Sequence, residues 1–117
     1  MDISEVERVL AQHPFLKKPK YVYVVEEPVT LQTNGMILFA GLTPKWRRDT
    51  IVLTPVASDV TVVHEVLHTM GAGEAVAYKL APLLRWFRSV VPPLLQRRVK
   101  YKYASSPHPK MKLYVRD

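Results

Sequence analysis

The chain has 117 residues, enough for one folded domain but too few for two separate hydrophobic cores. It contains no cysteine, which excludes disulfides, a thiol nucleophile and sulfur-ligated zinc or iron–sulfur sites. The net charge of +7 arises in residues 61–117, where ten basic residues stand against three acidic ones. Such an excess is typical of a surface that attracts nucleic acid, anionic lipid or acidic protein, and equally of a solvated face that keeps the protein soluble.

The N-terminal segment predicts a short helix. Ser4 and Glu7 have the spacing of a capping box, and apolar residues then recur at helical intervals. We expect this helix over residues 4–12, because the residue before Pro14 avoids helical backbone geometry. The acidic start of the chain lacks the layout of a secretory signal, and no apolar run is long enough to cross a membrane. We therefore expect an intracellular, cytoplasmic protein without a transmembrane segment.

Four segments of the first half have the composition of β-strands, being rich in β-branched and aromatic residues. Asn34 and Gly35 separate the second and third of them, and this pair is typical of a tight hairpin turn. A basic loop, 45–48, precedes the fourth. The expected strands lie near residues 21–25, 29–33, 36–42 and 50–54.

A helix is predicted over residues 59–70, capped by Ser58 and Asp59 and ended by the glycines at 71 and 73. Its expected apolar stripe consists of Val60, Val63, Leu67 and Met70.

A second helix is predicted from Glu74, with a kink or a restart at Pro82, which lacks an amide hydrogen. Beyond the proline, apolar residues are expected to oppose Arg85 and Arg88. Residues 94–103 predict a short basic helix or strand, and residues 104–117 an irregular C-terminal tail of a single domain, 1–117. Together the elements predict an α+β fold, in which a small, mostly antiparallel sheet packs on helix 59–70 and the helix from 74.

Two histidines on the predicted helix 59–70 carry the clearest chemical pattern. His64 and His68 are four residues apart, so their side chains lie on one face, where two imidazoles can bind one metal ion. Zinc accepts imidazole nitrogen and prefers four tetrahedral ligands, which leaves room for a third protein ligand and a water. Glu65 lies beside the first histidine and is a candidate general base for that water. The alternative is a helix that carries two unrelated histidines.

The third ligand has few candidates. His13 and His108 are remote in the sequence, whereas Glu74 follows His68 after a glycine-containing turn that can bring it back towards the metal. Carboxylate oxygen is an ordinary zinc ligand, so we favour Glu74. The alternative for Glu74 is a first-turn acid that stabilises the N-terminus of the second helix.

The segment His64-Glu-Val-Leu-His68-Thr-Met-Gly71-Ala-Gly-Glu74 resembles the zincin metallopeptidase motif. It is similar to the metzincin pattern H-E-x-x-H-x-x-G-x-x-H, with Glu74 in place of the third histidine. Glutamate as third ligand is instead typical of gluzincins, and Glu74-Ala-Val-Ala77 resembles the E-x-x-A pattern of minigluzincins and of anti-repressor metallopeptidases. Residues 50–82 carry the motif. The surroundings of Met111 match the methionine turn of metzincins poorly, which favours a structural residue.

This resemblance implies a zincin-like fold, one zinc ion bound by His64, His68 and Glu74, and peptide-bond hydrolysis by a zinc-bound water with Glu65 as general base. An oxyanion donor is also needed. Zincins bind substrate along a sheet edge, which the hairpin 29–42 could offer. The candidate oxyanion donors are Tyr78, Tyr101, Tyr103, His108 and Tyr114.

A different class of function remains open from the sequence: a non-catalytic module with a zincin-like shape that binds nucleic acid or an acidic partner. A further interpretation places residues 83–91, with Trp86 and Arg88, at a membrane surface, although one small core more readily needs this apolar stripe. For the tail, two hypotheses remain, occlusion of the metal site and a final strand over 112–115. The candidate basic surface consists of Arg85, Arg88, Arg97, Arg98, Lys100 and Lys102.

Overall fold

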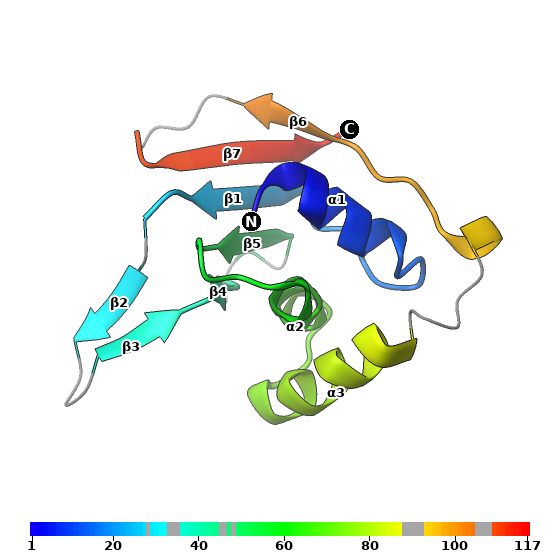
Figure 1. Cartoon of the computed structure of the whole chain (residues 1–117), viewed down its shortest axis with the longest axis horizontal. Helices are drawn as coiled ribbons and strands as arrows, with labels where there is room; N and C mark the ends of the chain where they lie inside the picture. The colour runs from blue at the N-terminus through cyan, green and yellow to red at the C-terminus, as the bar shows by residue number, and fades with distance from the viewer. Residues whose placement is uncertain (28, 33–35, 45–46, 48, 88–92, 105–108) are drawn as a thin grey trace.

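The computed structural model is an α+β fold with a five-stranded mixed sheet, a separate two-stranded sheet and three α-helices (Figure 1). It describes residues 1–27, 29–32, 36–44, 47, 49–87, 93–104 and 109–117. The helices are α1 (Ile3–Ala11), α2 (Asp59–Thr69) and α3 (Glu74–Phe87), followed by the short 3-10 helix η2 (Pro93–Leu95). The strands are β1 (Tyr21–Val25), β2 (Val29–Gln32), β3 (Met36–Phe39), β4 (Gly41–Leu42), β5 (Thr50–Leu53), β6 (Tyr101–Ala104) and β7 (Met111–Arg116).

The large sheet has the strand order β4-β5-β1-β7-β6. Its neighbouring pairs are antiparallel except for β1 and β5, which run parallel with Val22 opposite Ile51. The expectation of a mostly antiparallel sheet is therefore confirmed, and the single parallel pair makes the sheet mixed. A parallel pair needs a long crossover, and the chain between β1 and β5 supplies it through the hairpin β2–β3 and β4.

The predicted strand over 36–42 is two strands that belong to different sheets. β3 pairs with β2, as the hairpin prediction requires, whereas β4 leaves the hairpin and pairs with β5. The break falls at Ala40, whose carbonyl accepts hydrogen bonds from the backbone N–H of Thr54 at 3.0 Å and from its hydroxyl at 3.1 Å. The turn residues Asn34 and Gly35 lie outside the described residues.

The C-terminal residues form part of the sheet. β7 lies between β1 and β6, with Tyr23 opposite Leu113 and Tyr103 opposite Tyr114 (Figure 1). The hypothesis of a final strand is thus confirmed, and residues 111–116 are held within the sheet by β1 and β6. An irregular tail over 104–117 was the wrong prediction. One of the two partners of β7 is β1, about 90 residues earlier in the chain and beyond the reach of local sequence patterns.

Helix α1 packs beside α2, and its buried residues Val6, Val9 and Leu10 confirm the expected helical stripe. The N-terminal cap, however, is Asp2 rather than Ser4: an Asp2 carboxylate oxygen accepts the backbone N–H of Glu5 at 3.1 Å. Asp2 and Glu5 have the N-cap-to-N3 relation, so the helix begins one residue earlier than predicted.

Helix α2 is enclosed on two sides, between the sheet and α3 (Figure 1). It is buried through Val62, Val63, Val66 and Leu67, whereas Val60 and Met70 of the predicted stripe are exposed. A helix packed between two layers buries a wider arc than the single stripe of an amphipathic surface helix, which moves the centre of its buried face. The buried residues of α1, α2 and strands β1 and β5 make one hydrophobic core.

Helix α3 continues through Pro82 as one helix and packs on α2 through Ala77 and Ala81. Arg85 follows Ala77 and Ala81 at the same spacing of four residues and lies on the same inner side of the helix. Its side chain is only 8% exposed and forms an ion pair with Asp59. Leu83 and Trp86 are exposed, so the predicted orientation of this helix was wrong. The described residues include no helix that is both long and apolar enough to cross a membrane.

Candidate metal centre

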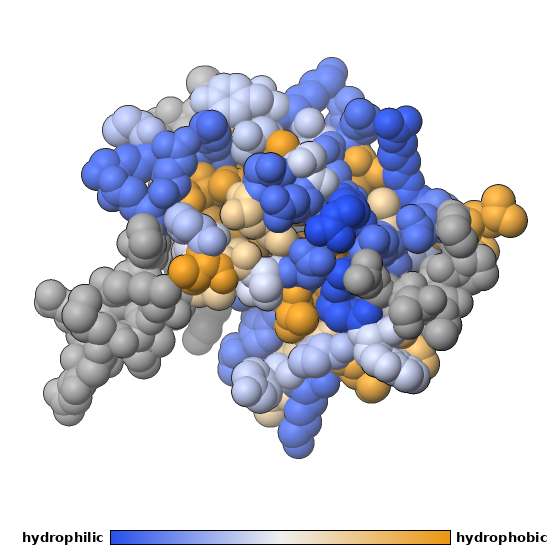
Figure 2. Space-filling view, viewed as in Figure 1, coloured by the Kyte–Doolittle hydropathy of each residue, from blue (hydrophilic) through white to orange (hydrophobic). Residues whose placement is uncertain are grey.

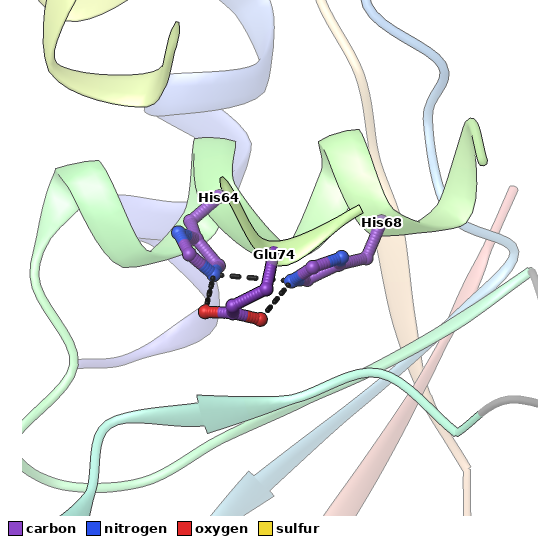
Figure 3. Close-up of side chains that lie close together, drawn as sticks. All are labelled: His64, His68 and Glu74. Atoms are coloured by element: carbon purple, nitrogen blue, oxygen red, sulfur yellow. Dashed lines mark hydrogen bonds and ion pairs between the residues drawn. The ribbon is translucent and has the colours of Figure 1, made fainter. Parts of the chain in front are cut away.

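Helix α2 places His64 and His68 one turn apart on the side that faces the start of α3 (Figure 3). The helix begins with a capping arrangement in which the Thr61 hydroxyl accepts the backbone N–H of Ser58 at 3.0 Å. This start fixes the first turn, and the four-residue spacing then sets the two imidazoles side by side. Their Nε2 atoms are 3.1 Å apart, and the rings meet edge to face.

The turn after α2 brings Glu74 to the two histidines. Gly71 has a φ of 96°, which reverses the chain in a conformation that side-chain-bearing residues rarely adopt. The N–H of Gly71 donates to the carbonyl of His68 and the N–H of Ala72 to that of Leu67, each at 3.0 Å. The chain then enters α3 at Glu74, whose side chain projects towards the imidazoles (Figure 3). The predicted return of the chain is therefore observed.

The three side chains converge through their ligand atoms. Glu74 Oε1 lies 3.0 Å from His64 Nε2, and Glu74 Oε2 lies 2.9 Å from His68 Nε2. These distances are slightly below the roughly 3.3 Å that separates neighbouring ligands in a tetrahedral zinc site with bonds near 2.0 Å. The histidine side chains are 17% and 18% exposed and that of Glu74 is 76% exposed, so the cluster is open to solvent on the side of Glu74.

The hydrogen bond of His68 to the backbone favours metal binding. Its Nδ1 lies 2.9 Å from the carbonyl oxygen of Ala72, and because a carbonyl only accepts, Nδ1 must donate. In the neutral imidazole the lone pair is then on Nε2, the atom that faces Glu74 and His64. A backbone partner of this kind commonly orients metal-binding histidines.

The chemistry of this group fits a divalent metal. Two imidazole nitrogens and a carboxylate bring lone pairs within 3.1 Å of one another, which is unfavourable unless a cation or shared protons lie among them. His64, His68 and Glu74 therefore form a group that could bind a metal ion, and two nitrogens with one oxygen suit zinc.

Glu65 points to a different neighbour, the segment that contains β4. Its side chain is buried, and its Oε1 accepts the Thr43 hydroxyl hydrogen at 2.8 Å. Burial raises the pKa of the Glu65 carboxyl, and the Thr43 hydrogen bond opposes part of that rise by stabilising the charged form. A buried carboxylate with one oriented oxygen beside two candidate metal ligands can act as a proton acceptor.

Gly41 explains how β4 comes so near to Glu65. A Cβ atom at this position would lie 2.9 Å from Cγ of Glu65 and 2.9 Å from Cγ2 of Thr61, too near for any side chain. The backbone of β4 thus lies against α2 at the level of Glu65, and β4 is the end strand of the large sheet. The candidate site therefore has a sheet edge next to its buried carboxylate.

The other predicted site residues have mixed positions. Tyr78 is exposed on α3, one turn after Glu74. Tyr114 packs on the core and meets Tyr103 edge to face at 5.7 Å between ring centres, and the buried Tyr101 hydroxyl donates to the Pro19 carbonyl at 2.5 Å. Tyr101 and Tyr114 thus have structural contacts, and Tyr103, although 62% exposed, lies on β6 against Tyr114. Tyr78 remains the described candidate on an element of the site. His108 lies outside the described residues.

Only part of the candidate basic surface is exposed. Arg85 is enclosed by an ion pair with Asp59 and by hydrogen-bond contact with Gln12, so it is a structural residue. Arg88 lies outside the described residues. The exposed members are Arg97, Arg98, Lys100 and Lys102.

The sequence gives no sign of Thr43 and Gly41 as neighbours of Glu65. Both lie 22 or more residues before it, and neither belongs to a recognisable motif. The glycine at the end of a predicted hairpin was the nearest signal, because an isolated glycine in a strand indicates a close backbone approach. Glu74, in contrast, was the third ligand that the sequence favoured.

Comparison with known proteins gives no match, whether with family models, curated proteins or solved structures. The interpretation of the site therefore rests on the chemistry and geometry of these residues.

Proposed function

We propose that this protein is a zinc-dependent metallopeptidase of the zincin type. The observation that carries the proposal is the convergence of His64, His68 and Glu74, whose side-chain nitrogen and oxygen atoms lie 2.9–3.1 Å apart. The buried Glu65 lies on α2, the helix of the two histidines. Two histidines four residues apart, the glutamate after the first and a carboxylate third ligand are the arrangement that hydrolytic zinc sites use. When bound, zinc would supply a Lewis acid and lower the pKa of a water towards neutrality.

The protein's own residues then divide the work. The Ala72 carbonyl holds His68 with its Nε2 lone pair towards the metal position, and Glu74 supplies the negative charge that balances part of the cation. Thr43 holds Oε1 of Glu65, which leaves Oε2 to accept a proton from the attacking water. The same carboxyl group later delivers this proton to the leaving amine.

The position of β4 supports a peptide as substrate. An extended peptide can add to the end strand of a sheet by backbone hydrogen bonds, and β4 is an end strand beside Glu65. A scissile bond bound along this edge would lie near both the candidate metal ligands and the candidate base. Tyr78 is the candidate donor to the oxyanion, because it lies on the helix that begins with Glu74.

The test combines metal analysis with one conservative substitution. Untagged protein purified without chelator should contain about one zinc per chain. Glu65→Gln should retain zinc and the fold but lose hydrolysis of a quenched-fluorescence peptide library by at least about 100-fold, since the amide cannot accept the proton. Glu5→Gln, an exposed carboxylate on α1, is the control and should keep full activity.

Two results would contradict the proposal: protein without zinc affinity, or hydrolysis that persists in Glu65→Gln. Protein that lacks zinc yet binds nucleic acid with a steep salt dependence would instead support the non-catalytic module, acting through the exposed basic residues 97–102.

A further inference from the structure

Three apolar side chains protrude from one end of the molecule, remote in the sequence from the metal ligands. Phe15 is 91% exposed, Leu94 is 96% exposed and Leu95 is 54% exposed. Phe15 lies in the loop after α1, and the leucines belong to η2. They line one surface depression together with Pro14 and Arg97. Figure 2 shows the corresponding apolar projection at its right edge, where Figure 1 places η2. We name Phe15, Leu94 and Leu95 the apolar tip.

The segments that carry the tip are tied to each other by backbone hydrogen bonds. The N–H of Arg97 donates to the Ala11 carbonyl at 3.1 Å, which joins the segment after η2 to the end of α1. The N–H of Leu16 donates to the His13 carbonyl at 3.1 Å and closes the turn that presents Phe15. The tip is therefore built by two connected segments, and nearly full exposure of a Phe and a Leu within one such patch indicates a surface for binding.

The charges of the two segments that carry the tip all have one sign, although Lys102 pairs with Asp117 of the C-terminal end at 3.1 Å. Every charged residue in segments 13–20 and 93–102 is basic, and no acidic residue occurs anywhere in 8–25 or 75–116. We name the seven basic residues of the two shorter segments the basic rim: Lys17, Lys18, Lys20, Arg97, Arg98, Lys100 and Lys102.

Members of the rim come near one another across the two segments. Lys18 donates to the carbonyls of His13 and Leu16 at 2.6 and 2.9 Å, and partial burial together with the nearby Arg97 guanidinium lowers the pKa of Lys18 to about 8. Arg116 donates to the Lys18 carbonyl from the end of β7. Lys18 and Arg97 thus lie close to each other beside the tip, and an anion placed against them would relieve their mutual repulsion.

We propose that the apolar tip and basic rim form a docking surface for a membrane that contains anionic lipid. Phe15, Leu94 and Leu95 would enter the boundary between headgroups and acyl chains, while the rim contacts anionic headgroups. Nucleic acid satisfies the charges equally well but gains little from two exposed leucines, since bases stack on aromatic rings. The tip lies on the loop after α1 and on η2, which contain none of His64, His68 and Glu74, so this proposal is independent of the peptidase proposal.

The experiment is co-sedimentation of the full chain with vesicles of phosphatidylcholine alone or with about 30% phosphatidylserine. We expect binding to the anionic vesicles only, weakening as salt is raised from roughly 0.1 to 0.5 M. The double substitution Phe15→Ser with Leu94→Ser should reduce partitioning at least about tenfold. Arg97→Gln with Arg98→Gln should also reduce it about tenfold. Two controls, Val56→Ser and Lys79→Gln, change an exposed apolar and an exposed basic residue outside the two segments and should bind like the wild type.

Far-ultraviolet circular dichroism and zinc content of each variant should match the wild type, since both tip residues are exposed. Absence of wild-type binding to anionic vesicles would overturn the proposal, as would equal binding by the Phe15/Leu94 double variant. Equal binding to duplex DNA by the wild type and that variant, with no vesicle binding, would assign the rim to nucleic acid instead. Loss of peptidase activity in Glu65→Gln has no bearing on vesicle binding, so the two proposals fail separately.

Discussion

Replacing Glu74 by Gln separates a metal ligand from a helix-capping charge. The Glu74 side chain is 76% exposed, so an amide of the same size fits without repacking. If Glu74 only stabilises the first turn of α3, loss of its charge should cost about 0.3–1 kcal/mol, with or without zinc. If it binds zinc, the neutral amide should weaken zinc affinity by about 100-fold or more, since even loss of a second-layer partner costs 10–100-fold.

The two cases differ in thermal stability. Zinc at 100 times its dissociation constant should stabilise the wild type by about 2.7 kcal/mol, or roughly 10 °C in Tm for a domain of this size. If Glu74→Gln binds zinc 100-fold more weakly, the same zinc concentration only equals its dissociation constant. Zinc then stabilises this variant by about 0.4 kcal/mol, or roughly 2 °C in Tm.

The assay is differential scanning fluorimetry with and without zinc, with affinities from isothermal titration calorimetry. Glu5→Gln is the matched control, because Glu5 is an exposed acid in the first turn of α1 as Glu74 is in α3. It should lower the stability of the metal-free protein by a similar amount but keep the full zinc response. An equal zinc response of Glu74→Gln and wild type would refute the assignment of Glu74 as a ligand.

Three further perturbations test the surroundings of the site and the sheet. Thr43→Val should lower kcat about tenfold with unchanged zinc affinity, because Glu65 loses the hydrogen bond that orients it. Thr43→Ser keeps a hydroxyl and should restore the rate. Unchanged kcat in Thr43→Val would show that Thr43 does not position the base. Gly41→Ala should lower the unfolding free energy by about 1–3 kcal/mol in urea titrations. The control Gly73→Ala should not, because its added Cβ meets no atom within 4 Å. Equal effects of the two substitutions would contradict the close approach of β4 to α2. Truncation after Tyr103 removes β7 from the middle of the sheet and should abolish cooperative unfolding by circular dichroism, so a folded and more active truncated protein would revive autoinhibition.

Local patterns predicted most of the elements. β1 and α1 were predicted to within a residue or so, and α2 to within one residue at its C-terminal end, because their signals are strand composition, a proline stop and a helix cap. The predicted stripe of α2 was correct for Val63 and Leu67 but not for Val60 and Met70, and the predicted face of α3 was wrong. Which side of a helix is buried depends on the layers around it, and Arg85 is turned inwards because Asp59 of another helix offers a partner.

The sheet order was beyond local patterns for the same reason. The parallel pairing of β1 with β5, the transfer of β4 out of the hairpin and the insertion of β7 all depend on partners distant in the chain. The composition of these segments indicates strands, but it does not say which strands are neighbours or in which register they pair. The backbone hydrogen bonds of a strand are the same for every partner.

For the candidate site, the sequence by itself indicated the three candidate ligands. The four-residue spacing places His64 and His68 on one helical face whatever the rest of the fold, and the short glycine turn limits how far Glu74 can depart from them. Only the tertiary structure decided the surroundings of Glu65: its burial, its hydrogen bond to Thr43 and the sheet edge beside Gly41. Helix geometry repeats over a few residues and can be read locally, whereas burial and contact between α2 and β4 arise only when distant segments pack into one core.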